Sequence, residues 1–191
     1  ELRKLAEEYK DLPVCADVYV KLAYVYRMSN ELLKTVEAAR EGIEKYPKHE
    51  WVSQLRSYID FASSPYLSMN IPFVYPNYEA DMNLTYANLK GVSFELYRLN
   101  ISLASSLIRG NLKEETLIQN YGTKVTSRYY ALPSTPDYEK HDTVLHYTLP
   151  EAGIYMLKQI PQGSAKGIDY SLLFVSPYQC ISIPVSEGRK E

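Results

Sequence analysis

The sequence predicts an α+β chain in which helices fill the N-terminal third and an all-β antiparallel sandwich follows. Two patterns support this prediction. Up to about residue 64, apolar side chains recur every three or four positions, which is the period of an amphipathic helix. From about residue 67, apolar and polar side chains alternate in short segments that end at turn-forming residues, as in half-buried strands. We therefore expect two domains, a helical one at residues 1–66 and a β-sandwich at residues 67–191.

The helical part is expected to contain four helices. Pro47 ends the third of them, because proline cannot continue the backbone hydrogen bonds of a helix. Ser29 or Asn30 is expected to cap the start of the same helix, since these side chains accept hydrogen bonds from its first N–H groups. The expected helices cover the stretch before residue 12 and residues 16–28, 31–46 and 50–61.

The two middle helices resemble a tetratricopeptide-type hairpin. Small residues on the second helix allow two antiparallel helices to approach closely. Only one copy of the pattern is convincing, whereas the units of such arrays bury their faces by stacking on neighbours. The hairpin is therefore either part of a peptide-binding repeat array or a structural cap on the β domain, and we favour the cap. The matching residues are Tyr19, Leu22, Ala23 and Tyr26, then Thr35, Ala39 and Gly42, followed by Pro47.

Seven or eight short strands are expected in the β part. Residues 82–86 and 92–96 alternate most clearly, and we interpret them as a hairpin-like antiparallel pair. Residues 169–176 are the most apolar segment and are expected at the centre of a sheet. Residues 72–76 have a proline at each end and are expected at an edge. The other strands are expected at residues 124–132, 143–149, 154–160 and 180–185, with an insertion at residues 100–122.

Charge and composition argue against nucleic acid and membrane partners. The 191 residues have a formal net charge of −2, which provides no attraction for nucleic acid or an anionic membrane surface. No apolar run approaches the roughly 18 residues that a spanning helix needs. Tyrosine is unusually frequent, with 19 Tyr against 4 Phe and 1 Trp. Because tyrosine suits strands and partly covered surfaces, a strand-rich composition explains the excess more simply than a dedicated tyrosine binding platform.

The residues that could do chemistry are few and badly spaced. His141 and His146 are five residues apart, so on a regular strand they face opposite sides, and His49 lies in a turn between helices. No glycine-rich phosphate loop, dinucleotide fingerprint or Gly-x-Ser-x-Gly elbow occurs. We expect no catalytic, cofactor-binding or metal-binding residue, no cofactor and no enzyme activity. A hydrolase stays open only if His141 or His146 meets a serine and a carboxylate in one cleft. Cys15 and Cys180 are expected to be buried free thiols.

Three stretches of the β part share short motifs with a known family. Residues 75–99 contain Tyr-Ala-Asn at 86–88 and Tyr-Arg-Leu at 97–99. Residues 149–160 contain Leu-Pro followed by Gly153 and Tyr155, and residues 170–178 contain Val-Ser. By these motifs and their order, the chain resembles the N-terminal region of bacterial alpha-2-macroglobulin-like proteins, a helical lead-in plus the first macroglobulin-type domain.

The resemblance implies a non-catalytic scaffold from a large exported protein, acting in protease trapping, protease inhibition or envelope defence. Many members of the family use an internal thioester with the sequence Cys-x-Glu-Gln. Neither Cys15 nor Cys180 begins that sequence, so the resemblance implies no covalent trap in this segment. The implied location is the periplasm or cell envelope of a bacterium. The implied partners are other domains of the same protein and target proteases.

A second function stays open, that of a peptide- or glycan-binding module of a cell-envelope protein. In that case the helical hairpin and the tyrosine-rich sandwich would hold the ligand. The sequence begins at Glu1 instead of a methionine, so we take it as a piece of a longer protein. The missing signal peptide therefore says nothing about export.

Overall fold

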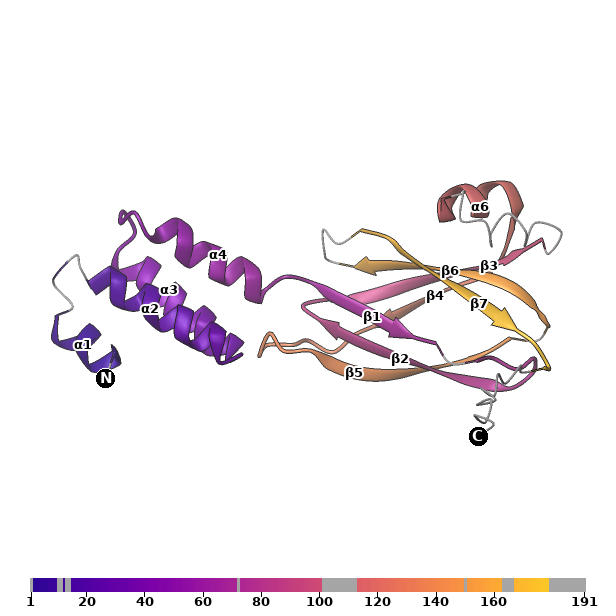
Figure 1. Cartoon of the computed structure of the whole chain (residues 1–191), viewed down its shortest axis with the longest axis horizontal. Helices are drawn as coiled ribbons and strands as arrows, with labels where there is room; N and C mark the ends of the chain where they lie inside the picture. Colours follow the sequence, from indigo (N-terminus) through magenta and orange to yellow (C-terminus); the bar gives the residue numbers. More distant parts are fainter. Residues whose placement is uncertain are drawn as a thin grey trace, which may run out of the picture.

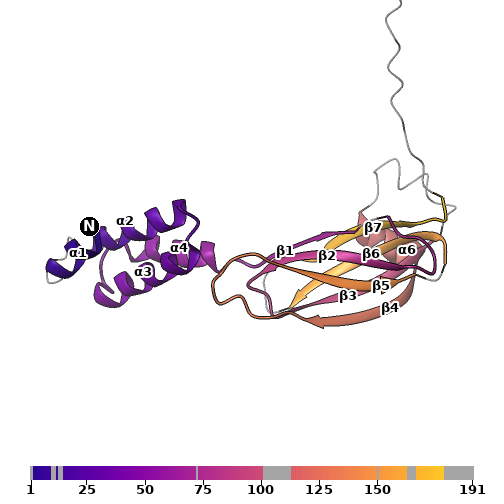
Figure 2. The ribbon, with the colours of Figure 1, turned by 90° about the horizontal axis from the view of Figure 1, so that it is seen from below.

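The chain forms a helical segment that leads into a two-layer β-sandwich, as the sequence predicts (Figure 1). The computed structural model describes residues 2–9, 12, 15–71, 73–100, 113–149, 151–162 and 167–178. The helical segment and the sandwich follow one another along the same long axis in two perpendicular views (Figures 1 and 2). The molecule is therefore elongated, with the helices at one end.

The four expected helices are present, with bounds within a few residues of those predicted. They are α1 (Leu2–Glu8), α2 (Cys15–Met28), α3 (Leu32–Lys45) and α4 (Val52–Ala62). Helices α2, α3 and α4 share a small core whose largest fully buried side chains are Tyr19 and Leu55. Tyr19 also donates a hydrogen bond from its hydroxyl to Glu41 of α3 and accepts one from Lys45. The core and this polar group together fix how α2 lies against α3.

Asn30 ends α2 and does not cap α3, so the predicted cap at Ser29 or Asn30 is wrong. Asn30 has a left-handed backbone with φ of 58°. Its N–H donates to the Arg27 carbonyl at 3.0 Å, and the next N–H, of Glu31, donates to the Tyr26 carbonyl at 2.9 Å. These two bonds form a Schellman motif, which satisfies the last carbonyls of α2. The residue before α3 is Glu31, and it makes no side-chain cap bond.

Gly42 lies where α3 crosses α2 and α4, and a larger residue there should destabilise the helical segment. An added Cβ would lie 2.8 Å from Tyr19 Cβ and 2.9 Å from Leu55 Cδ1. We expect Gly42→Ala to lower the free energy of unfolding by about 1–3 kcal/mol through overpacking, despite about 1 kcal/mol of better helix propensity. Urea denaturation followed by circular dichroism measures this. Glu44→Ala, at an exposed position of α3, is the control, and a Gly42→Ala variant as stable as the parent contradicts the close packing.

The sandwich contains a three-stranded sheet and a four-stranded sheet. Their strand orders are β1-β2-β5 and β4-β3-β6-β7, and all neighbouring strands are antiparallel. The main core lies between the sheets, where Leu84 of one sheet and Leu96 of the other are almost fully buried. The strands are β1 (Tyr66–Asn70), β2 (Glu79–Ala87), β3 (Gly91–Leu99), β4 (Gly122–Ala131), β5 (His141–Thr148), β6 (Gly153–Gln162) and β7 (Asp169–Val175).

Strands β2 and β3 do not pair with each other, which corrects the predicted hairpin. Strand β2 pairs with β1 and β5, whereas β3 pairs with β4 and β6 in the other sheet. The link between them crosses from one layer to the other, and the Lys90 N–H donates to the Gln162 carbonyl at 3.3 Å. The predicted buried faces are confirmed. All of Met82, Leu84, Tyr86, Val92, Phe94 and Leu96 are buried.

Strand β7 lies at the edge of the four-stranded sheet, so its predicted central position is wrong. It is apolar on both faces. Leu173 and Val175 enter the core, whereas Leu172 and Phe174 are 38% and 56% exposed on the outer face. The high apolar content of β7 therefore reflects an exposed outer face in addition to a buried inner one.

Two further strand predictions change. In the described residues 73–76 of the expected edge strand, Val74 forms an isolated parallel bridge with Val175, and the edge strand of this region is β1, which the sequence did not reveal. The expected insertion contains a helix, α6 (Glu114–Tyr121), whose Leu117 packs with Leu99 and Met156 on the outer face of the four-stranded sheet. The strand expected at residues 180–185 lies outside the described residues.

Candidate contact surfaces

The histidines of the sandwich bind carboxylates on its surface. A ring nitrogen of His141 lies 2.9 Å from the Asp137 carboxylate, and His146 Nδ1 lies 2.9 Å from Asp81. The hydrogen bond with His141 lowers the pKa of Asp137. Within the described parts of the chain, no group of three or more His, Cys, Asp or Glu side chains is placed to hold a metal ion. Cys15 is a buried thiol, as predicted, and its Sγ lies 3.8 Å from the Leu5 carbonyl oxygen. Cys180 lies outside the described residues.

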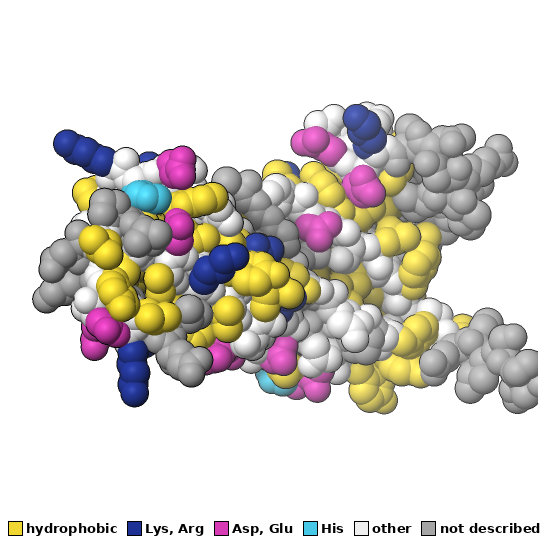
Figure 3. All heavy atoms as spheres, turned by 60° about the vertical axis from the view of Figure 1, so that its left-hand side comes forward, with side chains coloured by type: hydrophobic (Ala, Val, Ile, Leu, Met, Phe, Trp, Pro, Cys, Tyr) yellow, Lys and Arg dark blue, Asp and Glu magenta, His cyan; other side chains and the backbone are white. Residues whose placement is uncertain are grey.

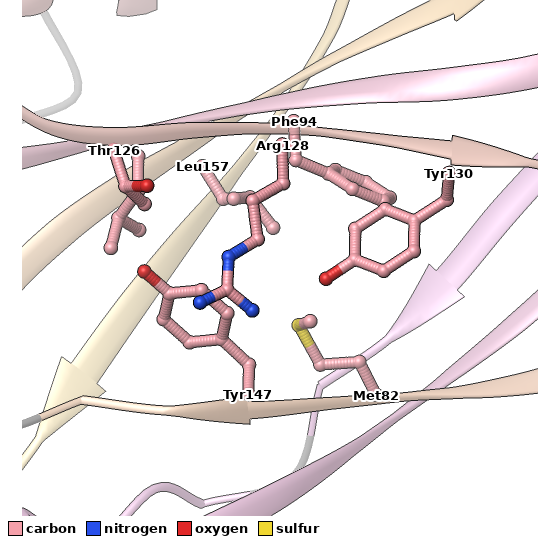
Figure 4. A pocket seen from close by; sticks show the side chains of 8 residues that line it. Met82, Phe94, Thr126, Arg128, Tyr130, Tyr147 and Leu157 are labelled. Atoms are coloured by element: carbon pink, nitrogen blue, oxygen red, sulfur yellow. The ribbon is translucent and has the colours of Figure 1, made fainter.

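Among the described residues, a space between the two sheets is too small for a ligand. It lies between the sheets on the side where β4 and β5 are the edge strands, and it measures about 20 Å³, enough for about one water molecule. In Figure 4 the Arg128 side chain points into it, and the guanidinium carbon lies 5.2 Å from the centre of the Tyr147 ring. Burial raises the pKa of the Tyr147 hydroxyl, and the Arg128 charge lowers it by less. Arg128 therefore covers the open side of the core with its aliphatic stem while its charge stays near water.

Asn88 fastens the helical segment to the sandwich. It follows β2 with a left-handed backbone at φ of 57°. Its side-chain amide donates to the Ala62 and Ser64 carbonyls, both at 2.9 Å, and its own N–H donates to Thr135 Oγ1 at 2.8 Å. These carbonyls lie at the end of α4, so one side chain joins α4 to the link between β2 and β3.

A second contact joins α3 to the loop between β4 and β5. The Arg40 guanidinium donates to the Tyr138 hydroxyl at 3.0 Å, and Tyr138 has a left-handed backbone with φ of 63°. In the same loop Lys140 Nζ lies 3.7 Å from the centre of the Tyr66 ring at the start of β1. The junction is therefore held from two sides, which accounts for the in-line arrangement in Figures 1 and 2.

Substitution of Asn88 should loosen this junction in two separable steps. Asn88→Gly keeps the left-handed backbone but loses the amide bonds, which we expect to cost about 1–2 kcal/mol. Asn88→Ala also replaces asparagine, which tolerates a left-handed backbone, with alanine, which does not, and this should add about 1–2 kcal/mol. Urea denaturation measures the free energies of unfolding, which should decrease from the parent protein to Asn88→Gly to Asn88→Ala. Small-angle X-ray scattering should show a broader distribution of shapes for both variants. Equal stability of all three proteins contradicts the role of the amide.

An exposed aromatic cluster lies at the end of the sandwich opposite the helices. We call it the distal aromatic surface and define it as Phe73, Tyr75, Pro76, Tyr78, Pro177 and Tyr178. The Phe73 and Tyr75 ring centres lie 4.9 Å apart and those of Tyr75 and Tyr78 lie 6.3 Å apart, both edge to face. Tyr78 and Tyr178 are 71% and 81% exposed. An open hollow of about 540 Å³ is lined by Tyr75, Pro76, Tyr78 and Pro177.

Main-chain bonds hold the distal aromatic surface in place. The Ser176 N–H donates to the Val74 carbonyl at 3.2 Å beside the bridge between Val74 and Val175. The Asn77 N–H donates to the Leu149 carbonyl at 2.7 Å, and Asn77 has a left-handed backbone with φ of 65°. The two valines are each 3% exposed. Buried valines thus anchor the segment whose aromatic neighbours point to solvent.

Only a weak signal for this surface is present in the sequence. The sequence shows the excess of tyrosine and a run of aromatic and proline residues at 72–78, of which residues 72–76 are predicted as an edge strand. The two halves of the surface are about a hundred residues apart in the chain, and the bridge at Val74 brings them together.

The helices also expose apolar side chains. Met28 and Phe61 are 68% and 52% exposed, and the Arg27 guanidinium lies 4.3 Å from the centre of the Phe61 ring. Figure 3 shows hydrophobic side chains gathered on the helical end that faces the viewer. The structural cap stays the prediction for α2 and α3, and a repeat-type peptide groove stays the alternative. None of the helices described is both long and apolar enough to cross a membrane.

Comparison with known proteins found no matching family model and no matching curated protein. Among solved structures, the chain is similar to Escherichia coli alpha-2-macroglobulin spanning domains MG0-NIE-MG1, with 16% identity and a TM-score of 0.43. It is also similar to the NIE-MG1 fragment of that protein, with 14% identity and a TM-score of 0.39. A third is the sporulation control protein Spo0M from Bacillus subtilis, with 11% identity and a TM-score of 0.36.

The extent of these similarities is limited. They cover 56%, 59% and 60% of this chain, and 39%, 61% and 50% of the three solved chains in the same order. All identities are below 25% and all TM-scores are below 0.5, so the similarity transfers no activity to this chain.

Proposed function

We propose that this chain is a non-catalytic scaffold module of a larger exported bacterial protein of the alpha-2-macroglobulin type. In that protein it would hold neighbouring domains in place during protease trapping, protease inhibition or envelope defence. The main supporting observation is the junction at Asn88, which joins the helical segment to the sandwich in line. The proposed partners are other domains of the same protein and, through them, target proteases. The proposed location is the periplasm or cell envelope.

The motif residues of the resemblance have structural roles, and this supports a scaffold. Asn88 fastens α4, as described above. Arg98 forms an ion pair with Glu151, and the Tyr155 hydroxyl donates to the Glu151 carbonyl at 3.0 Å. An added Cβ at Gly153 would lie 3.3 Å from the Tyr155 ring. These residues together close one end of the four-stranded sheet.

The test uses the full-length protein that contains this chain. Incubated with an endopeptidase, it should be cleaved in a bait segment and should then shield the protease from large substrates while small substrates are still hydrolysed. The 191-residue chain alone should not inhibit. A full-length protein that is neither cleaved nor protective rules out the trapping role.

A second candidate function is that of a peptide- or glycan-binding module. The hollow at the distal aromatic surface favours it, because aromatic side chains around an open hollow of about 540 Å³ fit the size range of ligand sites. This function requires measurable binding by the chain itself, whereas the scaffold function does not.

A further inference from the structure

We propose that the distal aromatic surface binds a proline-rich peptide segment in the polyproline II conformation. This inference rests on the second of the two functions proposed above and names its ligand. It goes beyond the scaffold role, because the partner is an extended peptide and not a folded domain of the same protein.

The lining of the hollow matches such a ligand in shape. Tyr75 and Tyr78 present flat aromatic rings 6.3 Å apart and set edge to face, and the puckered apolar rings of Pro76 and Pro177 complete the described lining. Grooves that bind polyproline II segments are lined by aromatic side chains, between which the proline rings of the ligand insert. The ligand helix has three residues per turn and a rise of about 3.1 Å per residue. The proline side chains of the ligand are therefore regularly spaced and can pack against the fixed rings of the distal aromatic surface.

The hydrogen-bonding groups favour a proline-rich peptide over a glycan. Among the described residues that line the hollow, the polar side-chain groups are the hydroxyls of Tyr75 and Tyr78. A proline-rich segment has few N–H donors but exposes its carbonyl oxygens, and a tyrosine hydroxyl such as that of Tyr78 can donate to them. A sugar presents many hydroxyls, each of which needs a donor or an acceptor, and two tyrosines and two prolines satisfy few of them. The tyrosine hydroxyls of the lining can therefore donate hydrogen bonds to the carbonyl oxygens of an otherwise apolar ligand.

The surface is also held in its shape before a ligand arrives. Asn77 and Ser176 bind the neighbouring main chain at 2.7 Å and 3.2 Å, and the valines beneath are buried. A preformed surface and a ligand with little conformational freedom both reduce the entropy lost on binding. Even a contact area of a few side chains then gives measurable affinity.

The experiment titrates the 191-residue chain with a decaproline peptide and follows binding by isothermal calorimetry and by amide chemical shifts. We expect saturable binding, with shift changes at residues of the distal aromatic surface. Tyr78→Ala should weaken binding about tenfold or more, as expected for an aromatic residue at the centre of a contact. Tyr129→Ala is the matched control, because Tyr129 is 58% exposed on β4 outside the surface, and it should leave binding within about twofold.

Each other outcome is informative. Absence of decaproline binding, or equal weakening by Tyr78→Ala and Tyr129→Ala, overturns the inference. Binding of chitohexaose but not decaproline, with loss in Tyr78→Ala, overturns the inference but keeps the second function as a glycan module. Binding of neither probe removes both. Self-association that Tyr78→Ala abolishes, without decaproline binding, assigns the surface to a second copy of the chain and overturns the inference.

Discussion

Raising the pH above about 10 is expected to unfold this protein cooperatively, because its folded state keeps a set of tyrosine hydroxyls neutral. Burial is the main cause that raises the pKa of each of them above the ordinary value of 10.0 for tyrosine. They are Tyr19, Tyr46, Tyr86, Tyr97, Tyr147, Tyr155 and Tyr170. In the unfolded chain the same groups ionise near pH 10. Stability is therefore complete below that pH and is lost as the pH rises toward the folded-state pKa values.

The measurement follows tyrosinate absorbance and circular dichroism against pH in the same sample. The tyrosines whose pKa burial raises should ionise together with the loss of β-structure. Tyr86→Phe should move the unfolding midpoint to higher pH, because Tyr86 is 3% exposed and burial is the cause of its raised pKa. Tyr129→Phe, at an exposed ring, should not move it. Complete tyrosine ionisation before any loss of structure contradicts this account.

Leu84→Ala is expected to lower the free energy of unfolding by about 3 kcal/mol. Leu84 has 0% of its surface exposed and lies in β2, the central strand of the three-stranded sheet. Its replacement removes buried methyl groups and leaves a cavity between the sheets, and such substitutions typically cost about 2–5 kcal/mol. Urea denaturation with a two-state fit gives the change.

The neighbouring residue provides the control. Thr85 points to the other face of β2 and donates a hydrogen bond to Asp142 at 2.6 Å on the surface. Thr85→Ala should cost less than about 1 kcal/mol. If Thr85→Ala is the more damaging substitution, β2 has the opposite face buried, because a shift of one residue in register exchanges the two faces.

The sequence was sufficient to predict which residues face the core, but not which strands lie side by side. Alternation in β2 and β3 identified Met82, Leu84, Val92 and Phe94 as buried. However, alternation of apolar and polar residues shows only which face of a strand is buried. That face is the same whether two consecutive strands pair in one sheet or lie opposite each other in the two sheets of a sandwich. The left-handed backbone of Asn88 begins the link between the two layers, and asparagine at a turn does not by itself distinguish these cases.

The errors at Asn30 and β7 have similar causes. Asparagine is common both at the N-cap of a helix and in the left-handed position that ends a helix. In the short link between α2 and α3, Asn30 takes the left-handed position at the end of α2. High apolar content predicted a central strand at β7, but Phe174 and Leu172 remain exposed. Local composition cannot show what covers an outer face. The distal aromatic surface escaped prediction for the same reason, since it forms only when Val74 meets Val175.

The placement of β1 and β7 has a mechanical consequence. Strand β1 starts at the helical end of the sandwich, whereas β7 finishes at the distal end (Figure 1). A tensile force applied between α4 and Tyr178 therefore acts along the strands. The ladder of β1 on β2 spans five residue pairs from Tyr66 to Asn70, and in this direction its bonds are loaded together in shear instead of opening one after another. The sandwich would thus transmit tension along its length, and the amide of Asn88 would carry part of that load at the junction.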